Sequence, residues 1–363
     1  MKIAIYTISK NESKHVDRFM ESTKGADIVI VADTGSNDDT IEILRKHGAI
    51  VSQININPWR FDKARNASLN LIPTDIDVCI CLDLDEILCP NWREGIEKYW
   101  KDNTTRLRYE YTWSWLSDGK PDVVYYADKI HARHGYEWRH PVHECLYYIG
   151  TGKENIEFGG LKVEHHPDNS KSRGSYLQLL ELSVKEDPDN DRNSYYLGRE
   201  YYFYKQYDKA INELERHLKL PSARWLPERS ASMKFIASSY SKKNNQDQSI
   251  IWLMRACAEA SKERESWVEL AQAYLNQKNY LGGYYAAIQA LNIKERPRSY
   301  ITKGVAWGAW PHDVAGTCAF YIGLQQKSLE HYEDALKLDS NNQRIVANLE
   351  LVRERLNGKL PSK

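Results

Sequence analysis

The sequence predicts an α/β domain with a mainly parallel sheet, followed by an all-α domain of helical repeats. Three observations predict it. Strand-length apolar runs alternate with helical patterns over roughly the first 85 residues, small and aromatic residues recur at repeat spacing in the second half, and the 363 residues amount to about two typical domains. We therefore expect one domain over residues 1–170 and a second over 171–363.

The composition is that of a globular protein that shows no charge preference for a partner. Lys+Arg 50 balance Asp+Glu 50, which disfavours a dedicated nucleic-acid binder. No apolar run approaches the roughly 20 residues that cross a bilayer. Residues 1–6 do not resemble a signal peptide, and the six cysteines form no CxxC pair, so we expect free thiols and a cytoplasmic protein.

Four strands are expected in the first part of the chain, at residues 2–8, 27–32, 49–56 and 76–82. Helical patterns separate them, and Ser9 and Glu12 have the spacing of a capping box for the first helix. Parallel strands need such crossovers, and ligands of parallel sheets bind beyond the carboxyl ends of the strands.

Residues 105–165 favour antiparallel strands. Apolar and polar residues alternate from Leu107 to Trp115, a turn is expected over residues 117–121, and residues 123–126 return. A further hairpin is expected over residues 146–158. We expect this extension of the sheet to shape an acceptor pocket.

Asp83 and Asp85 follow the fourth expected strand directly. On an extended chain these two side chains face the same way, so both can approach one hard cation such as Mg²⁺ or Mn²⁺. The alternative is a solvated acidic loop that caps the next helix.

Four motifs occur in one order along the first part of the chain: residues 7–12 (TISKNE), 33–40 (DTGSNDDT), 64–69 (ARNASL) and 82–86 (LDLDE). Together they resemble the family 2 glycosyltransferases, which have the GT-A fold. The resemblance covers roughly residues 1–170 and is closest to short bacterial and phage members with a tetratricopeptide tail, a group that includes bacteriocin S-glycosyltransferases. Thr34 departs from the second aspartate that the family usually carries there.

The resemblance implies a nucleotide-sugar site. By it, Asp33 faces the uracil ring, Thr7 lines the same pocket, Arg65 faces the nucleotide and Asp83 reaches the ribose. Two alternatives stay open: Asp33 builds a strand-end turn, and Arg65 forms a surface salt bridge.

The resemblance also implies a Mn²⁺ or Mg²⁺ ion held by Asp85, with His165 as a further ligand ahead of His166. Residues 136–144 (YEWRHPVHE) resemble the subgroup's Trp-x-x-x-Val-His-Glu stretch, which makes Glu144 the candidate general base. The alternatives are that Glu144 orients a neighbouring group or caps a helix, and that the histidine pair is an ordinary loop.

The second half matches a tetratricopeptide template in four copies and a closing helix. Tyr201, Tyr240 and Tyr274 are 39 and 34 residues apart, which brackets the 34-residue period of that repeat. Residues 295–315 strain the period and are expected as a loop over a groove. Such repeats bind peptides or a second copy of the chain.

The expected function is therefore metal-dependent transfer of a sugar from a nucleotide-sugar, a UDP-sugar, to a peptide, saccharide or other acceptor, with inversion. Two alternatives stay open. One is a tetratricopeptide interaction protein with an inactive first domain. The other is a nucleotidyltransferase, against which the missing Gly-rich phosphate loop counts.

Overall fold

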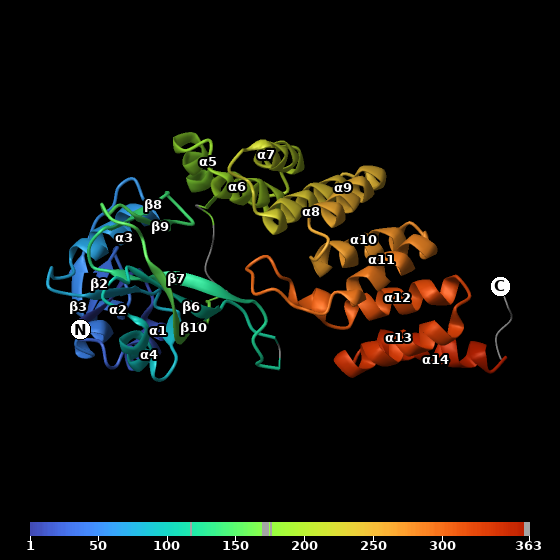
Figure 1. Ribbon diagram of the computed structural model, residues 1–363, viewed down its shortest axis with the longest axis horizontal. Coiled ribbons are helices and arrows are strands. Elements are labelled where there is room, and N and C mark those ends of the chain that lie inside the picture. The colour runs from blue at the N-terminus through green and yellow to red at the C-terminus, as the bar shows by residue number, and fades with distance from the viewer. Residues whose placement is uncertain (117, 169–173, 175, 359–363) are drawn as a thin grey trace. The chain divides into compact units, whose positions relative to one another are not determined.

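The computed structural model describes residues 1–116, 118–168, 174 and 176–358. It divides into two compact units (Figure 1), which are residues 1–183 with 298–300 and residues 184–297 with 301–363. The expected boundary at residues 170 and 171 and the first residue of the expected 117–121 turn lie outside the described residues.

Unit 1 is built on an eight-stranded sheet in the order β3-β2-β1-β4-β7-β6-β10-β5, with a separate β8–β9 hairpin. The strands are β1 (Ile3–Ser9), β2 (Ile28–Asp33), β3 (Ile50–Gln53), β4 (Val78–Cys81), β5 (Glu86–Leu88), β6 (Arg106–Thr112), β7 (Val124–Ala132), β8 (Tyr136–Arg139), β9 (Cys145–Tyr148) and β10 (Ile156–His165). The four strands expected in the first part of the chain are confirmed, and neighbours among them pair in parallel.

The antiparallel extension is confirmed in part. β7 runs antiparallel to both β4 and β6. The expected hairpin over residues 146–158 is wrong, because β9 pairs with β8 in the small sheet while β10 pairs in parallel with β6. A run of alternating residues predicts a strand but not its partner, which long-range packing decides.

Helices cover both faces of the sheet of unit 1. They are α1 (Ser13–Ser22), α2 (Thr40–Lys46), α3 (Phe61–Asn70) and α4 (Trp92–Tyr99), and α5 (Tyr176–Glu186) runs across the division into units. Alternate residues of β1 face opposite cores. Ile3 and Ile5 pack with residues of α1, α2 and α4, whereas Ala4 and Tyr6 pack with Leu69 of α3 and with the β8–β9 hairpin.

The first helix is not capped as expected. α1 begins at Ser13 after Glu12, whose side chain makes no cap hydrogen bond; Asp38 Oδ2 accepts from the Ser13 amide instead. Ser9 is the last residue of β1, and its hydroxyl donates to Asp33 Oδ2 at 2.7 Å. The capping-box prediction was wrong because a partner on the neighbouring strand takes the Ser9 side chain.

Unit 2 consists of antiparallel helix pairs of a tetratricopeptide-like repeat with a closing helix. The helices are α6 (Asp191–Phe203), α7 (Tyr207–Lys219), α8 (Leu226–Lys242), α9 (Gln246–Glu259), α10 (Arg264–Asn276), α11 (Tyr280–Asn292), α12 (Trp310–Tyr321), α13 (Gln325–Leu338) and α14 (Gln343–Leu356). Four of them begin at an asparagine whose side chain accepts from the backbone three residues later, a strong N-cap: Asn190, Asn245, Asn279 and Asn342.

Glycines lie where the repeat helices touch. A Cβ at Gly198 of α6 would lie 2.5 Å from Cγ of Leu214 on α7, and one at Gly283 of α11 would lie 2.7 Å from the Cys318 sulfur on α12. The small residues that mark the repeat in the sequence are therefore required by close helix packing.

The stretch 295–315 is only partly a loop. A short 3-10 helix, η1 (Gly304–Trp307), interrupts it, and α12 begins within it at Trp310 with Pro311 in the first turn. Proline there costs nothing because the first amides of a helix have no intrahelical partner, so the expectation of a continuous loop was wrong.

The closing helix α14 buries Ile345, Leu349 and Val352 against α12 and α13 and turns polar residues outward.

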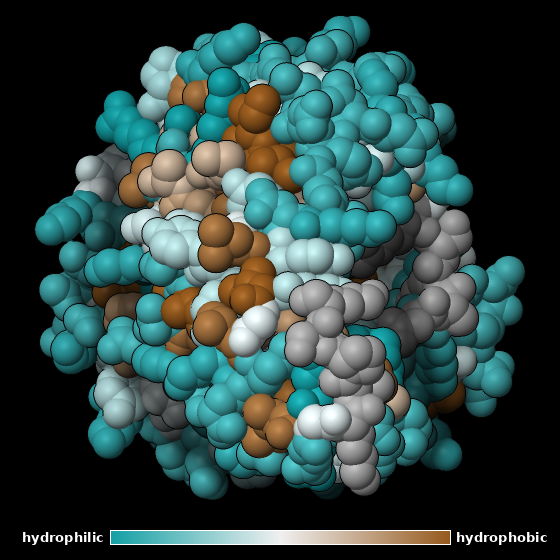
Figure 2. Space-filling model, turned by 90° about the vertical axis from the view of Figure 1, so that its right-hand side faces the viewer, coloured by the Kyte–Doolittle hydropathy of each residue, from teal (hydrophilic) through white to brown (hydrophobic). Residues whose placement is uncertain are grey.

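Figure 2 shows the side of the molecule on the right of Figure 1 as mainly hydrophilic, with small apolar patches. In the part of the chain that the structure describes, no helix is both long and apolar enough to cross a membrane.

Candidate active site

The carboxyl ends of β1, β2 and β4 bring polar side chains to one edge of the sheet. β1 lies between the other two, and Ser9 at its end is in register with Asp33 at the end of β2. Asp33 is fully buried. Its carboxylate accepts from the amides of Gly35 and Ser36 and from the hydroxyls of Ser9 and Ser36.

These donors set the charge of Asp33. Burial alone would raise the pKa of the Asp33 carboxyl, but the hydrogen bonds from Ser36, Ser9 and Gly35 outweigh burial and lower that pKa. Four hydrogen bonds match the acceptor capacity of a carboxylate. Asp33 therefore builds the loop 33–36, and its contact with a uracil ring stays a prediction.

Thr7 lies two residues before the end of β1 and is fully buried. Its hydroxyl donates to the carbonyl of Ile8, and its own carbonyl accepts from the Ser68 hydroxyl of α3. These contacts join β1 to α3, and a role of Thr7 in lining a nucleotide pocket stays a prediction.

Asp83 and Asp85 lie in a tight turn rather than on an extended strand. The Glu86 amide donates to the Asp83 carbonyl, and the Asp83 amide donates back to Oε2 of the buried Glu86. The turn sends the two aspartates to different partners. The extended conformation expected for these two residues is absent, because β4 ends at Cys81, and their joint approach to one cation stays a prediction.

Arg65 joins two of the expected site residues. This side chain of α3 is buried, and its guanidinium donates through Nη2 to Asp83 Oδ1 at 2.8 Å and through Nε to Glu144 Oε1. The ring of Trp138 lies 5.2 Å from the guanidinium carbon. The alternative of a surface salt bridge for Arg65 is therefore wrong, since the arginine is enclosed between two carboxylates and an aromatic face.

Lys129 of β7 is a member of the site that the sequence did not reveal. Its ammonium lies 2.9 Å from Oε1 of Glu86 and 3.6 Å from Oδ2 of Asp83. Burial by itself would lower the pKa of Lys129, but Glu86 and Asp83 outweigh burial and raise that pKa. Burial by itself would raise the pKa of Asp83. The positive charges of Arg65 and Lys129 outweigh burial and hold the pKa of Asp83 well below its ordinary value.

His165, the last residue of β10, has one ring nitrogen directed at Asp85. Its Nδ1 lies 3.0 Å from the carbonyl oxygen of Trp113, and its Nε2 lies 3.4 Å from Asp85 Oδ2. A carbonyl oxygen only accepts, so Nδ1 carries a proton and Nε2 is the nitrogen left to face the carboxylate. The Trp113 ring stacks on His165, with centroids 4.4 Å apart.

The Asp85–His165 pair fits a divalent cation. An oxygen and an imidazole nitrogen 3.4 Å apart can both reach one ion with bonds of about 2.1 Å, and the carbonyl on Nδ1 orients the ring as partners of metal-bound histidines do. Without an ion, burial lowers the pKa of His165 but Asp85 outweighs burial and raises it.

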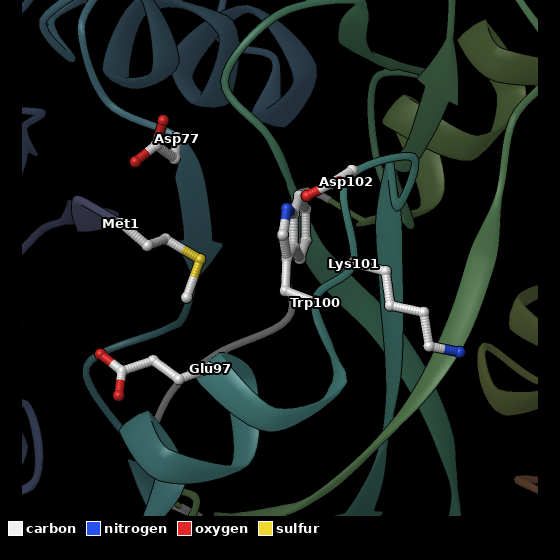
Figure 3. Close-up of a pocket in the computed structure, with 6 residues that line it drawn as sticks. All are labelled: Met1, Asp77, Glu97, Trp100, Lys101 and Asp102. Carbon is white, nitrogen blue, oxygen red and sulfur yellow. The ribbon is translucent and has the colours of Figure 1, made fainter.

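The pocket drawn in Figure 3 is a separate feature of unit 1. It is lined by Met1, Asp77, Glu97, Trp100, Lys101 and Asp102. Met1 and Asp77 precede β1 and β4, so this pocket lies at the amino ends of the strands, away from the edge that carries Asp33, Asp83 and Asp85.

Residues 4–145 match the model of the family described as "Glycosyl transferase family 2". The first part of the chain is a glycosyl transferase family 2 domain. Its match contains Thr7, Asp33, Arg65, Asp83, Asp85 and Glu144, and it ends before β10 and His165.

A curated relative of this family 2 domain is the "Uncharacterized glycosyltransferase RC0292" of Rickettsia conorii, 35% identical over 97 residues. The match covers 26% of the chain and 33% of the relative, so the chain spans about a third of the length of that protein.

Among solved structures, the chain is similar to MamA of Desulfovibrio magneticus RS-1, with 15% identity, 47% of this chain and 86% of the other covered, and a TM-score of 0.37. It is also similar to YrrB, described as a TPR protein with an unusual peptide-binding site, with 13% identity, coverage of 48% and 81%, and a TM-score of 0.37.

Within and beside the family 2 domain, the structure joins five of the seven expected site residues into two groups, and Thr7 and Asp33 belong to neither. Arg65 contacts Asp83 and Glu144, and His165 faces Asp85. Lys129 and Tyr111, which donates to Glu86 Oε1, are the partners that sequence reasoning missed. The Asp-x-Asp-Glu order pointed to Glu86, whereas a lone lysine in a strand carries no signal of its own.

Proposed function

We propose that the protein is a metal-dependent glycosyltransferase that moves a sugar from a UDP-sugar to a peptide or saccharide acceptor with inversion. The family 2 domain supports glycosyl transfer. The observation that carries the metal dependence is the Asp85–His165 pair, with the proton of His165 held on Nδ1, beside the Arg65–Asp83 ion pair at the carboxyl edge of the sheet. The UDP-sugar and the inversion follow from the family resemblance.

The transfer has a simple balance. The acceptor oxygen or sulfur forms a bond to C1 of the sugar, the bond from C1 to the diphosphate oxygen breaks, and the nucleoside diphosphate leaves with that electron pair. A Mn²⁺ or Mg²⁺ ion bound by Asp85 and His165 would supply positive charge beside the leaving group. The proton of the acceptor goes to Glu144, whose Oε1 is bound by Arg65 and whose Oε2 takes the proton.

Arg65 prepares two of these groups at once. Its guanidinium fixes the Glu144 carboxylate and the Asp83 carboxylate in one buried network. Asp83 has two further contacts: its carboxylate lies 3.6 Å from the Lys129 ammonium, and its amide donates to Glu86 Oε2. Holding the base and the donor-facing carboxylate in fixed positions reduces the entropy that the reaction would otherwise lose on orienting them.

The first test replaces Asp85 by Asn, which keeps the size of the side chain and removes its charge. We expect the Mn²⁺-dependent turnover of UDP-sugars to fall about 100-fold or more, with an unchanged circular dichroism spectrum. Asp39→Asn is the matched control, because Asp39 is exposed and its side chain makes no cap hydrogen bond. Full Mn²⁺-dependent turnover by Asp85→Asn would reject the assigned metal site.

The second test replaces Glu144 by Gln, whose carbonyl oxygen still accepts from Arg65. A lost general base lowers kcat about 100-fold or more and leaves the KM of the donor unchanged. Glu137→Gln, in the neighbouring strand β8, is the control. A raised donor KM with an unchanged kcat would instead make Glu144 a positioning residue. Turnover assays with peptide acceptors and with saccharide acceptors decide which class is used.

A further inference from the structure

Three side chains of unit 2 converge where consecutive repeat helices meet. Asp191 begins α6, His217 lies in the last turn of α7 and Glu228 in the first turn of α8. Because the helices run up, down and up, the start of α6, the end of α7 and the start of α8 lie at one end of the stack. One ligand-type atom of each residue lies within 4.8 Å of the other two.

His217 is directed into this cluster with an unused nitrogen. The residue is fully buried, and among the described residues its Nε2 has no hydrogen-bond partner. Its Nδ1 lies 2.9 Å from the Ser232 hydroxyl, which fixes the ring, and the Tyr195 ring packs 5.9 Å away. A buried polar nitrogen without a partner is costly, so such an atom in a native fold indicates a missing ligand.

The spacing suits a metal ion better than a hydrogen bond. Nε2 of His217 lies 3.5 Å from Oε1 of Glu228, whereas a charge-assisted hydrogen bond is about 2.7–2.9 Å long. Two ligands of a tetrahedral ion with bonds of about 2.0–2.1 Å are roughly 3.4 Å apart. The carboxylates of the half-buried Asp191 and the buried Glu228, with ligand atoms within 4.8 Å of one another, also repel, which a dication offsets.

We propose that Asp191, His217 and Glu228 bind a Zn²⁺ ion that joins the first helix pair of the repeats to the second. A set of one imidazole and two carboxylates suits zinc, which binds histidine nitrogen and carboxylate oxygen in a tetrahedral shell. The Ser232 hydroxyl would accept a hydrogen bond from Nδ1–H of His217, which leaves Nε2 as the nitrogen that binds the metal. This site lies in unit 2 and does not depend on the function proposed for the family 2 domain.

The test uses the full chain carrying Asp85→Asn, stripped with EDTA and titrated with ZnCl₂ in a calorimeter. We expect one Zn²⁺ per chain, tenfold or more weaker binding after Asp191→Asn, and no binding at this site after His217→Gln. Asp189→Asn is the matched control, because Asp189 is an exposed carboxylate two residues before Asp191 and its substitution leaves the affinity unchanged.

Hydrogen exchange locates the ion independently of affinity. Zn²⁺ is expected to slow exchange at the start of α6, the end of α7 and the start of α8 together. If His217→Gln does not fold, Asp191→Asn decides the matter, because Asp191 is only half-buried. The proposal is overturned if Asp85→Asn binds no Zn²⁺, or if Asp191→Asn binds it as tightly as the control and exchange at the three helix ends does not change.

Discussion

Lys129 is a cation that two carboxylates at the carboxyl edge share. Its ammonium faces both Glu86, which is buried, and Asp83. Replacing Lys129 by Met keeps the length of the side chain and leaves two carboxylates without their shared cation. We expect the free energy of unfolding to fall by about 3 kcal/mol, because breaking a buried ion pair strands the remaining charge.

Urea unfolding of unit 1 measures this loss. Lys162→Met is the matched control, since the Lys162–Glu110 pair lies 3.0 Å apart but the lysine is 62% exposed, and we expect a change below about 1 kcal/mol. Adding Glu86→Gln to Lys129→Met should restore part of the stability. Equal effects of the two lysine substitutions would contradict the role given to Lys129.

At the scale of residues, the sequence predicted chemistry better than contacts. Asp83 and Asp85 were expected because carboxylates at strand ends are ligand types, whereas His165 was expected from the family resemblance alone. The tight turn that follows Cys81 could not be inferred. It depends on the Glu86 carboxylate accepting from the Asp83 amide, and Glu86 is itself held by Tyr111 and Lys129 from distant strands.

The contact between α6 and α7 makes a prediction at the scale of elements. Gly198→Ala gains about 1 kcal/mol of helix propensity, but the new Cβ would lie 2.5 Å from Cγ of Leu214 and 3.3 Å from its backbone nitrogen. Overpacking of this kind costs about 1–3 kcal/mol, so we expect net destabilisation.

Thermal unfolding of Gly198→Ala, Leu214→Ala and the double variant measures the contact. In the double variant the added methyl occupies the space that Leu214 leaves, so its loss of stability should be smaller than the sum of the two single losses. Strict additivity, or a stabilised Gly198→Ala, would show that the helices can separate at this position.

Elements with a local signature were predicted well, and those defined by distant partners were not. The four apolar runs of the first part of the chain and the paired helices of unit 2 carry their own periodicity and turn residues. Residues 146–158 contain two genuine strand segments, but the choice of β8 for β9 and of β6 for β10 depends on residues far along the chain. Pro311 lies in the first turn of α12, within the stretch 295–315 that the sequence predicts as a loop.

The whole molecule contains two separately packed units, each with its own buried core. We expect differential scanning calorimetry to resolve two unfolding transitions. UDP with Mn²⁺ should raise only the transition of unit 1, and ZnCl₂ added to Asp85→Asn only that of unit 2. Ligand at about 100 times its dissociation constant adds about 2.7 kcal/mol, which corresponds to roughly 5 °C or more.

UDP without Mn²⁺ is the control for the first shift, and MgCl₂ in place of ZnCl₂ is the control for the second. A single transition that both ligands raise equally would contradict the independence of the units. A second copy of the chain bound through the repeats stays a prediction, as does a peptide bound there.

His165 donates the hydrogen on Nδ1 to the main-chain carbonyl oxygen of Trp113, and any amino acid at position 113 offers that oxygen. A substitution of Trp113 can therefore replace the indole ring by another side chain without changing the tautomer of His165. The tautomer of His165 and the shape of the ring stacked on it can therefore change separately, so the metal site proposed for Asp85 and His165 would keep its histidine geometry through such substitutions.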